Sequence, residues 1–273
     1  MKRFAIGGAE VGSEQLLVIA GPCVVESVDL CLRVATHLKA WCAARALPFV
    51  FKASYRKANR SSARSFEGLA LDEALGALAR VRSEVGVPVL TDVHEEREVE
   101  AAAEVADAIQ IPAFLSRQTS LLKAAARTGR AVNVKKGQFL APDDMARVVE
   151  KLAAAGCDRI LLTERGTTFG YHDLVVDMRG LVAMRSLGWP VLYDATHSLQ
   201  RPGGEVSGGE RRYAAPLMRA AVACGVDGLF FETHPDPSRA LSDPATQLPL
   251  AEAEGFLEQA RRVHEVAREA AHA

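Results

Sequence analysis

The chain has 273 residues, 49% of them hydrophobic, so it is long enough to bury a large core in one domain. Its 33 Lys and Arg nearly balance its 34 Asp and Glu, which argues against a nucleic-acid-binding protein, because such proteins usually carry a basic surplus. We find no signal peptide and no apolar stretch that suits a membrane span, and the five cysteines lack disulfide or CxxC spacing. We therefore expect a protein of the reducing cytoplasm.

Eight short apolar segments alternate with segments of helical composition. Each is rich in Val, Ile, Leu or Phe, which is typical of parallel strands covered by helices. We predict strands at residues 16–21, 49–54, 87–93, 108–114, 131–136, 159–164, 190–197 and 228–234. The clearest helical segments between them each end in a glycine, a common helix terminator, and they cover residues 72–86, 120–129 and 143–156.

This alternation predicts an α/β fold, a single-domain (β/α)8 TIM barrel over residues 1–273. The residues before Leu16 form a short N-terminal extension that we expect to cap the bottom of the barrel. An open, doubly wound sheet is the alternative. It is disfavoured because neither GxGxxG nor GxxxxGK[ST] follows the first strand.

Polar residues stand at the carboxyl end of every predicted strand. Barrel enzymes place their active sites at these ends. The residues concerned are Cys23, Lys52, Asp92, Gln110, Lys135, Lys136, Glu164, Arg165, Asp194, His197, Glu232 and His234.

Several of these residues are cations on different strands. The second strand runs into "FKASYRKANRSS", and the fifth and sixth strands add further positive charges. Cations that meet at one mouth repel each other unless anions bind there, so we expect a phosphate- and carboxylate-binding site rather than a solvated basic surface. The set comprises Lys52, Lys57, Arg60, Lys135, Lys136 and Arg165, with Asn59, Ser61 and Ser62 as uncharged donors. A Schiff-base aldolase that uses Lys52, Lys135 or Lys136 remains an alternative.

Cys23 follows the first strand directly, after Gly21-Pro22. In a closed barrel, strand eight lies beside strand one, so His197, Glu232 and the acidic loop after strand eight come near this thiol. Thiolate, imidazole and carboxylate groups together bind divalent first-row metals such as Zn, Fe or Mn. The alternative is an inert buried thiol beside a hydrogen-bonded rim histidine.

Taken in order, these motifs resemble the 3-deoxy-D-manno-octulosonate 8-phosphate synthase family, also called 2-dehydro-3-deoxyphosphooctonate aldolase. The resemblance runs from "AGPCVVES" through "FKASYRKANRSS", "TDVHE", "QIPAFLSRQT", "NVKKGQF" and "ERGTTFGYHDLVVDM" to "DATHSLQ" and "ETHPDPSRALSDPATQLPL". It implies a transferase that joins phosphoenolpyruvate (PEP), D-arabinose 5-phosphate and water. The products would be 3-deoxy-D-manno-octulosonate 8-phosphate, a precursor of lipopolysaccharide Kdo, and inorganic phosphate.

The resemblance also implies a metal-dependent branch of that family. Metal-independent members carry Asn where this chain has Cys23, and "KKGQF" and "SDPATQLP" resemble the metal-dependent members. The implied ligands of the divalent ion are Cys23, His197, Glu232 and Asp243, with Asp236 left as a structural residue of a turn.

Further roles are carried over by the same resemblance. The implied catalytic residues are Cys23, His197, Lys57, Asn59 and Asp243. The implied PEP-binding residues are Lys52, Lys57, Gln110, Ala113, Lys135 and Arg165, and Asp92 is a further polar residue of that site. The implied arabinose 5-phosphate residues are Asn59, Arg60, Ser61, Phe114 and Arg117; the last two lie in a segment that reaches a neighbouring subunit in the family, which implies a homotetramer.

A sister family shares this fold and metal pattern. It makes 3-deoxy-D-arabino-heptulosonate 7-phosphate and typically reads K-P-R-T where this chain has "KANRSS". A four-carbon sugar phosphate is therefore the alternative acceptor. A non-enzymatic sugar-phosphate binder would keep the cations but would not need the four implied metal ligands.

Overall fold

The structure, a computed structural model, describes residues 1–58, 66–201 and 208–272. Within these ranges, eight parallel strands form the barrel predicted from the sequence. They are β3 (Leu17–Gly21), β4 (Phe49–Lys52), β5 (Val89–Asp92), β6 (Ala108–Ile111), β7 (Ala131–Lys135), β8 (Ile160–Glu164), β11 (Val191–Asp194) and β14 (Gly228–His234).

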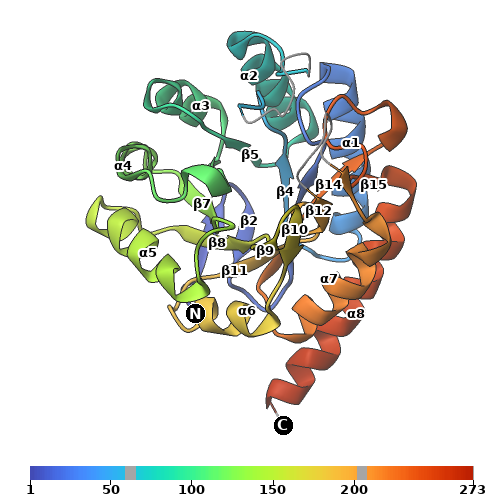
Figure 1. Ribbon diagram of the computed structural model, residues 1–273. Coiled ribbons are helices and arrows are strands. Elements are labelled where there is room, and N and C mark those ends of the chain that lie inside the picture. The colour runs from blue at the N-terminus through green and yellow to red at the C-terminus, as the bar shows by residue number, and fades with distance from the viewer. Residues whose placement is uncertain (59–65, 202–207, 273) are drawn as a thin grey trace.

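The strands pair in chain order, and the ring closes where β14 pairs with both β3 and β11. Helices surround this ring (Figure 1) and cover its apolar outer face, which explains the nearly continuous apolar strand sequences. They are α1 (Val28–Ala43), α2 (Leu71–Arg80), α3 (Val99–Val105), α4 (Thr119–Arg127), α5 (Met145–Ala154), α6 (Met178–Arg185), α7 (Ala214–Ala223) and α8 (Leu250–His272). No helix in the described ranges has the length and apolar character that a bilayer crossing requires.

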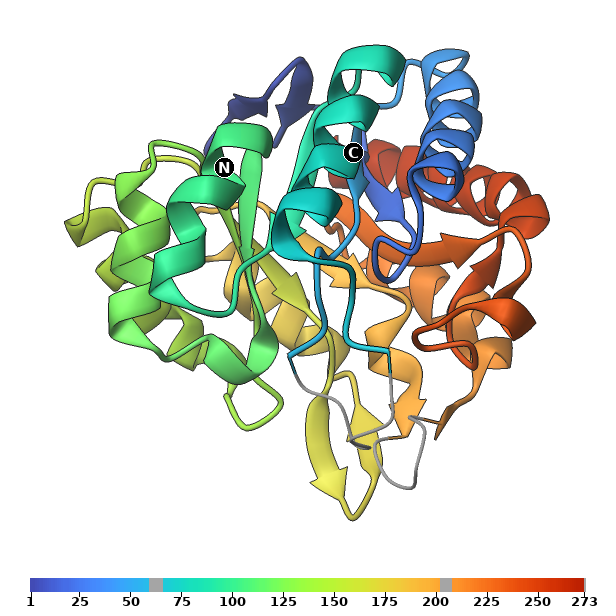
Figure 2. The same cartoon turned by 90° about the horizontal axis from the view of Figure 1, so that it is seen from above.

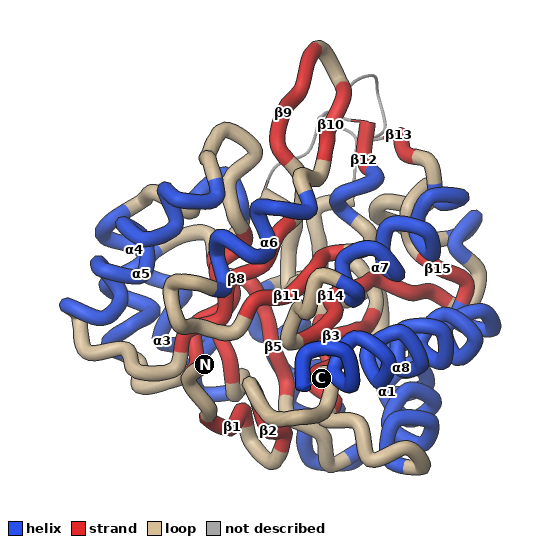
Figure 3. The backbone as a smooth tube through the Cα atoms, turned by 90° about the horizontal axis from the view of Figure 1, so that it is seen from below, coloured by secondary structure: helices blue, strands red, loops and turns tan. Residues whose placement is uncertain are grey.

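The N-terminal extension closes the bottom of the barrel, as predicted. Strands β1 (Phe4–Ile6) and β2 (Ala9–Val11) form an antiparallel hairpin. Figures 2 and 3 show this hairpin at one end of the barrel, and a second hairpin projects from the opposite end. The buried side chains of Ile6, Ala9 and Val11 pack against the apolar layer inside the strands, including Leu17 and Phe230.

The short elements lie in the connections. The projecting hairpin pairs β9 (Thr167–Gly170) with β10 (Asp173–Val175), β12 (Gln200–Arg201) pairs with β13 (Gly208–Gly209), and β15 (Leu248–Pro249) extends the sheet beside β14. A π-helical turn, η1 (Val81–Val85), continues α2 up to Gly86. The 3-10 turns are η2 (Glu96–Glu98), η3 (Ala113–Leu115), η4 (Pro142–Asp144), η5 (His197–Leu199), η6 (Arg211–Tyr213) and η7 (Pro237–Arg239).

Above the apolar layer, the barrel interior becomes polar. Asn133 Nδ2 donates to Gln110 Oε1 at 3.0 Å, and Thr163 Oγ1 donates to Asn133 Oδ1 at 2.7 Å. All three side chains are buried, so these hydrogen bonds satisfy groups that water does not reach. This layer supports the ionisable groups at the carboxyl ends of the strands.

Two of the other cysteines pack in the hydrophobic core. Burial raises the pKa of Cys31 and of Cys42, both in α1, to about 12. Both thiols therefore stay neutral and act as small apolar side chains.

Candidate active site

Four side chains with metal-ligand chemistry meet at the mouth of the barrel. The ligand atoms of Cys23, Glu232 and Asp243 all lie within 4.8 Å of one another. His197 Nε2 joins them, at 3.5 Å from Glu232 Oε1 and 4.0 Å from Asp243 Oδ2. The barrel closure causes this meeting, because Glu232 in β14 is paired with Gly21, two residues before Cys23. The predicted convergence is present; that these residues bind a metal remains a prediction.

The chemistry of this cluster fits a divalent ion. Glu232 Oε2 is buried and has no hydrogen-bond partner among the described residues, which leaves a lone pair free for a cation. Burial, reinforced by the charge of Glu232, raises the pKa of Cys23 well above its usual value, so the thiol keeps its proton until a cation replaces it. Sulfur, nitrogen and carboxylate oxygens form a donor set that suits Zn, Fe or Mn.

Cys23 is held by the loop that carries Asp243. Cys23 N donates to Gln247 Oε1 at 3.2 Å, and Gln247 Nε2 donates to Ser242 O at 2.7 Å. Cys23 Sγ lies 2.8 Å from Ser242 Oγ and 3.4 Å from Asp243 Oδ2. Ser242 and Gln247 lie within the "SDPATQLP" motif, but the sequence assigned neither of them a role, because both are more than 200 residues from Cys23 along the chain.

Lys52 and Lys57 provide the positive charge nearest to Glu232. Lys52 Nζ lies 2.7 Å from Glu232 Oε1 and donates to Cys23 O at 3.0 Å. This approach of β3 to β4 requires Gly21, since a Cβ there would lie 2.0 Å from Lys52 O. Burial alone raises the pKa of Glu232, but Lys52, with further help from His197 and Lys57, outweighs burial and holds this pKa below its usual value. Glu232 is therefore ionised at neutral pH.

Asp194, at the end of β11, organises a second group of charges. Its Oδ2 accepts from Lys135 Nζ at 2.6 Å and lies 2.8 Å from His197 Nδ1. Its Oδ1 accepts from the backbone N–H groups of Thr196 and His197, at 3.0 and 2.8 Å. Burial opposes the charge of Asp194, yet His197 and Lys135 keep the pKa of this carboxyl below its usual value. Burial lowers the pKa of Lys135, and nearby Lys52 adds to that effect.

Arg165 lies beside Lys135 at the same mouth. Its Nη2 donates to Gln200 Oε1 at 2.6 Å, whereas its Nη1 is buried without a hydrogen-bond partner among the described residues. A buried donor of this kind is available to an anionic ligand. Gln110 in β6 and Ala113 in η3 are also buried, and their part in binding an anion stays a prediction.

The prediction that Lys136 adds to this positive charge is wrong. Successive side chains in a strand point to opposite faces, so Lys136 points away from the interior that Lys135 faces. Lys136 Nζ donates to Thr167 Oγ1 at 2.8 Å and to Leu140 O at 3.2 Å, and it lies 3.6 Å from Glu164 Oε1. Its charge is used to anchor the chain after β7.

Residues 6–269 match the sequence profile of the DAHP synthetase I family. A 2-dehydro-3-deoxyphosphooctonate aldolase of Trichlorobacter lovleyi is 53% identical over 270 residues, which is 98% of this chain and 99% of that protein. The same enzyme of Syntrophobacter fumaroxidans is 51% identical over 271 residues, 98% of this chain and 94% of that protein. The chain belongs to the 2-dehydro-3-deoxyphosphooctonate aldolases of this family.

Because the chain belongs to the aldolase family, it is an enzyme. The comparisons confirm the resemblance seen in its motifs. A third aldolase, from Thioalkalivibrio sulfidiphilus, is 53% identical over 262 residues, 95% of this chain and 94% of that protein. The sister synthase that makes a seven-carbon product is therefore not favoured as the identity of this enzyme.

Part of the predicted sugar-phosphate site lies outside the described residues. This applies to Asn59, Arg60, Ser61 and Ser62, whose roles stay predictions. Phe114 and Arg117, which the resemblance assigns to the same substrate, are exposed on and after η3; Phe114 exposes 57% of its surface. An exposed phenylalanine of this kind is free to contact another molecule.

Two further acidic residues, Asp92 and Asp236, have different surroundings. Asp92, at the end of β5, is buried and lies 3.1 Å from His94 Nε2, while its Oδ1 has no partner among the described residues. Asp236 accepts from Ser238 N at 3.1 Å at the start of η7, so it is the structural turn residue that was expected.

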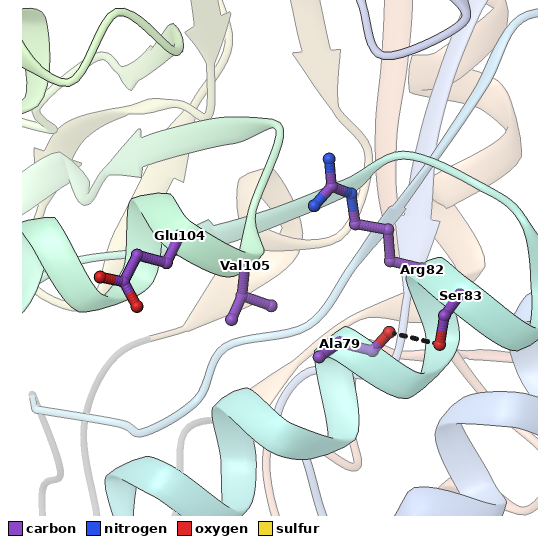
Figure 4. Close-up of a pocket in the computed structure, with 5 residues that line it drawn as sticks. All are labelled: Ala79, Arg82, Ser83, Glu104 and Val105. Atoms are coloured by element: carbon purple, nitrogen blue, oxygen red, sulfur yellow. Dashed lines mark hydrogen bonds between the residues drawn. The ribbon is translucent and has the colours of Figure 1, made fainter.

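A depression on the outside of the barrel is separate from this site. Figure 4 shows that it lies between α3 on one side and α2 with its continuation η1 on the other. Its lining residues are Ala79, Arg82, Ser83, Glu104 and Val105. Arg82 forms an ion pair with Asp107 at 2.9 Å, so its charge is already matched. Cys23, Asp194 and Glu232, whose pKa values are shifted by burial and by neighbouring charges, lie at the barrel mouth instead, where we place the chemistry.

Proposed function

We propose that this enzyme condenses PEP with D-arabinose 5-phosphate and water. The products are 3-deoxy-D-manno-octulosonate 8-phosphate, which feeds lipopolysaccharide Kdo synthesis, and inorganic phosphate. The convergence of Lys57, Lys135 and Arg165 beside the Cys23–His197–Glu232–Asp243 cluster carries this proposal. The names of the relatives support the same reaction.

The buried cations bind the two anionic groups of PEP. Lys135 and Arg165 come from adjacent strand ends, and the unpaired Nη1 of Arg165 provides a donor for a phosphate or carboxylate oxygen. Lys57 Nζ, which lies 3.9 Å from Glu232 Oε1 and donates to Ser54 Oγ at 2.8 Å, adds charge on the side of the metal-ligand cluster. Gln110 and Ala113 border PEP, and Lys52 acts mainly through Glu232.

The enzyme belongs to the metal-dependent branch in this proposal. Cys23, His197, Glu232 and Asp243 hold one divalent ion such as Zn, Fe or Mn, and the free Oε2 of Glu232 supports that assignment. When bound, the ion polarises an oxygen of the substrate or orients the water.

The residues of the chain align the reacting atoms. PEP C3 attacks the sugar aldehyde, water adds to PEP C2, and phosphate leaves by cleavage of the C–O bond, so no phosphoryl group is transferred. The cations fix PEP while Asn59, Arg60 and Ser61 bind the sugar phosphate, which brings two dilute reactants into one geometry. Fixed positive charge at the mouth also stabilises the departing phosphate.

We also propose that the enzyme forms a homotetramer and acts in the cytoplasm. The exposed Phe114 and Arg117 suit a segment that completes a neighbouring subunit's site in a homotetramer. A cytoplasmic location agrees with the cysteines of the described ranges, none of which forms a disulfide.

Product analysis tests the reaction. Purified enzyme is incubated with PEP and either arabinose 5-phosphate or erythrose 4-phosphate, with and without EDTA. We expect an eight-carbon product and phosphate only with the five-carbon sugar, loss of both with EDTA, and recovery with Mn²⁺. A seven-carbon product at equal rate would contradict the acceptor, and trapping of substrate on a lysine by borohydride would indicate a Schiff-base aldolase.

A further inference from the structure

Asp194 connects the two halves of the site through one oxygen atom. Its Oδ2 accepts from Lys135 Nζ at 2.6 Å and lies 2.8 Å from His197 Nδ1, and Lys135 Nζ lies 3.2 Å from the same imidazole nitrogen. Lys135 faces the region that binds anions. His197 presents its other nitrogen to Glu232 and Asp243.

The carboxylate is fixed in this position. Its side chain is fully buried, and Oδ1 accepts from the backbone N–H groups of Thr196 and His197. Thr196 Oγ1 in turn accepts from Glu232 N at 2.7 Å, which ties this turn to β14. Asp194 therefore cannot rotate to serve Lys135 or His197 alone without breaking hydrogen bonds inside the core.

The contact with Asp194 suits one form of His197. An ionised Asp194 can only accept, so it pairs with an imidazole that carries a proton on Nδ1, and the neutral tautomer of that kind is the one that can offer Nε2 to a cation. Nε2 is then left with a lone pair that faces the carboxylates of Glu232 and Asp243. A carboxylate behind a ligating histidine raises the basicity of the nitrogen that binds the ion.

We propose that Asp194 is a positioning residue that couples metal binding at His197 to PEP binding at Lys135. This inference rests on the proposed function. A cation on Nε2 makes Nδ1–H a stronger donor, so Asp194 Oδ2 interacts more with the imidazole and less with Lys135. The charge of Lys135 then becomes more available to PEP, so the metal should tighten PEP binding.

Thermodynamic linkage requires the reverse effect to have the same size. PEP at Lys135 draws the ammonium charge toward its own anionic groups, which leaves Asp194 more available to His197 and strengthens metal binding. A role of Asp194 in packing alone would lower both affinities without changing the factor by which one ligand improves the other.

Gln200 supplies a matched control from the same segment. It holds Arg165, the other cation of the anion site, through the 2.6 Å hydrogen bond from Nη2. Gln200→Ala should weaken PEP binding because Arg165 loses its partner. It leaves the Lys135–Asp194–His197 contacts in place, so the coupling factor should stay at the wild-type value.

Calorimetry on the full chain tests the proposal. The dissociation constant of PEP is measured in EDTA-treated protein and with saturating Mn²⁺, and that of Mn²⁺ is measured with and without PEP. In the wild type we expect each ligand to tighten the other about fivefold or more. In Asp194→Asn, which keeps the Oδ1 acceptor but not the Oδ2 acceptor, we expect a factor within about twofold of unity. The proposal would be overturned if Asp194→Asn kept the coupling factor of the wild type. It would also be overturned if Gln200→Ala lost this coupling.

If Asp194→Asn does not fold, Lys135→Met tests the same coupling. It removes the lysine side of the link and leaves the Asp194–His197 contact, so PEP should bind more weakly and the factor should again fall to within about twofold of unity. A retained factor would overturn the proposal. A wild-type enzyme that makes the eight-carbon product but shows no coupling contradicts this inference alone, whereas one that neither binds PEP nor makes product contradicts the proposed function.

Discussion

The bottom and the top of the barrel are built from the same eight strands but have opposite interiors. In β14, Phe230 lies in the apolar layer and Glu232, two residues later, lies among the ionised groups. β11 repeats this change from Leu192 to Asp194. A step of two residues, about 6.6 Å along a parallel strand, keeps the side chain on the inner face. The bottom layer thus stabilises the fold, while the top layer holds charges that are costly to bury and useful for binding anions and cations.

The largest effect should follow from breaking the Lys52–Glu232 pair at the top. Both side chains are at most 1% exposed, so Lys52→Met leaves a buried carboxylate without its nearest partner. We expect a loss of about 3–5 kcal/mol in the free energy of unfolding, measured in urea, and loss of activity.

The double variant Lys52→Met/Glu232→Leu is the control. It removes both charges, so most of the stability should return while activity stays absent. If Lys52→Met lost less than about 1 kcal/mol, the top layer would not be under the electrostatic constraint described above.

A cavity at the bottom should affect stability alone. Ile6 is 1% exposed and packs in the barrel interior, so Ile6→Ala should cost about 2–4 kcal/mol in the free energy of unfolding. kcat/KM for PEP should stay within about twofold, because the hairpin is at the opposite end from the site. Glu10→Ala, at an exposed position of the same hairpin, is the matched control and should change stability by less than about 0.5 kcal/mol. A large fall in kcat/KM in Ile6→Ala would show that the two ends are not independent.

Adjacent lysines offer a finer test at the top. Lys135→Met should raise KM for PEP about 10- to 100-fold, since one charge-assisted contact is lost. Lys136→Met should lower stability, because Glu164 and Thr167 lose their partner, but leave KM within about threefold. Steady-state kinetics and urea unfolding on both variants separate these outcomes. Equal KM changes would contradict the opposite directions of the two side chains.

The smallest effect is the pH dependence of stability. The pKa values of Asp194 and Glu232 are lower in the folded chain than in the unfolded chain, so their ionised forms stabilise the fold at neutral pH. That contribution is present above a pH of about 4 and is lost as the pH falls through the folded-state values. Urea unfolding between pH 7 and pH 3 should show this decline. The decline in the free energy of unfolding should be smaller in Glu232→Gln. In Ile6→Ala the decline should be unchanged, because this substitution lowers the free energy of unfolding by the same amount at every pH.

Much of the barrel could be predicted because its strands are buried on both faces. Continuous apolar runs mark all eight, and the glycines after the helices, such as Gly86 and Gly129, have the positive φ values that end helices readily. The β9–β10 hairpin was missed as a strand pair. Its side chains are mostly exposed and show no apolar alternation, and Phe169 at 78% exposure contributes to no core.

The site was predictable only where barrel geometry determines it. The position of Glu232 and Asp194 at strand ends predicts that they lie at the barrel mouth. Side chains alternate between the two faces of a strand, so the sequence of β7 is enough to predict that Lys135 and Lys136 point in opposite directions. Gln247 and Ser242 could not be found this way, because the loop after β14 meets Cys23 only when the barrel has closed. The "SDPATQLP" motif contains both residues, but their contacts with Cys23 depend on side-chain geometry across that closure.

The pairing of β3 with β14 has a consequence for synthesis of the chain. Leu17 lies beside Gly228, so more than 200 further residues must be synthesised before both edges of the first barrel strand are paired. Until then the nascent chain exposes an unpaired strand edge and pays a large loop-closure entropy, which favours slow folding and chaperone dependence. A polypeptide interrupted before Asp243 would also lack one of the four proposed ligands of the divalent ion, so the proposed metal site could be completed only late in synthesis.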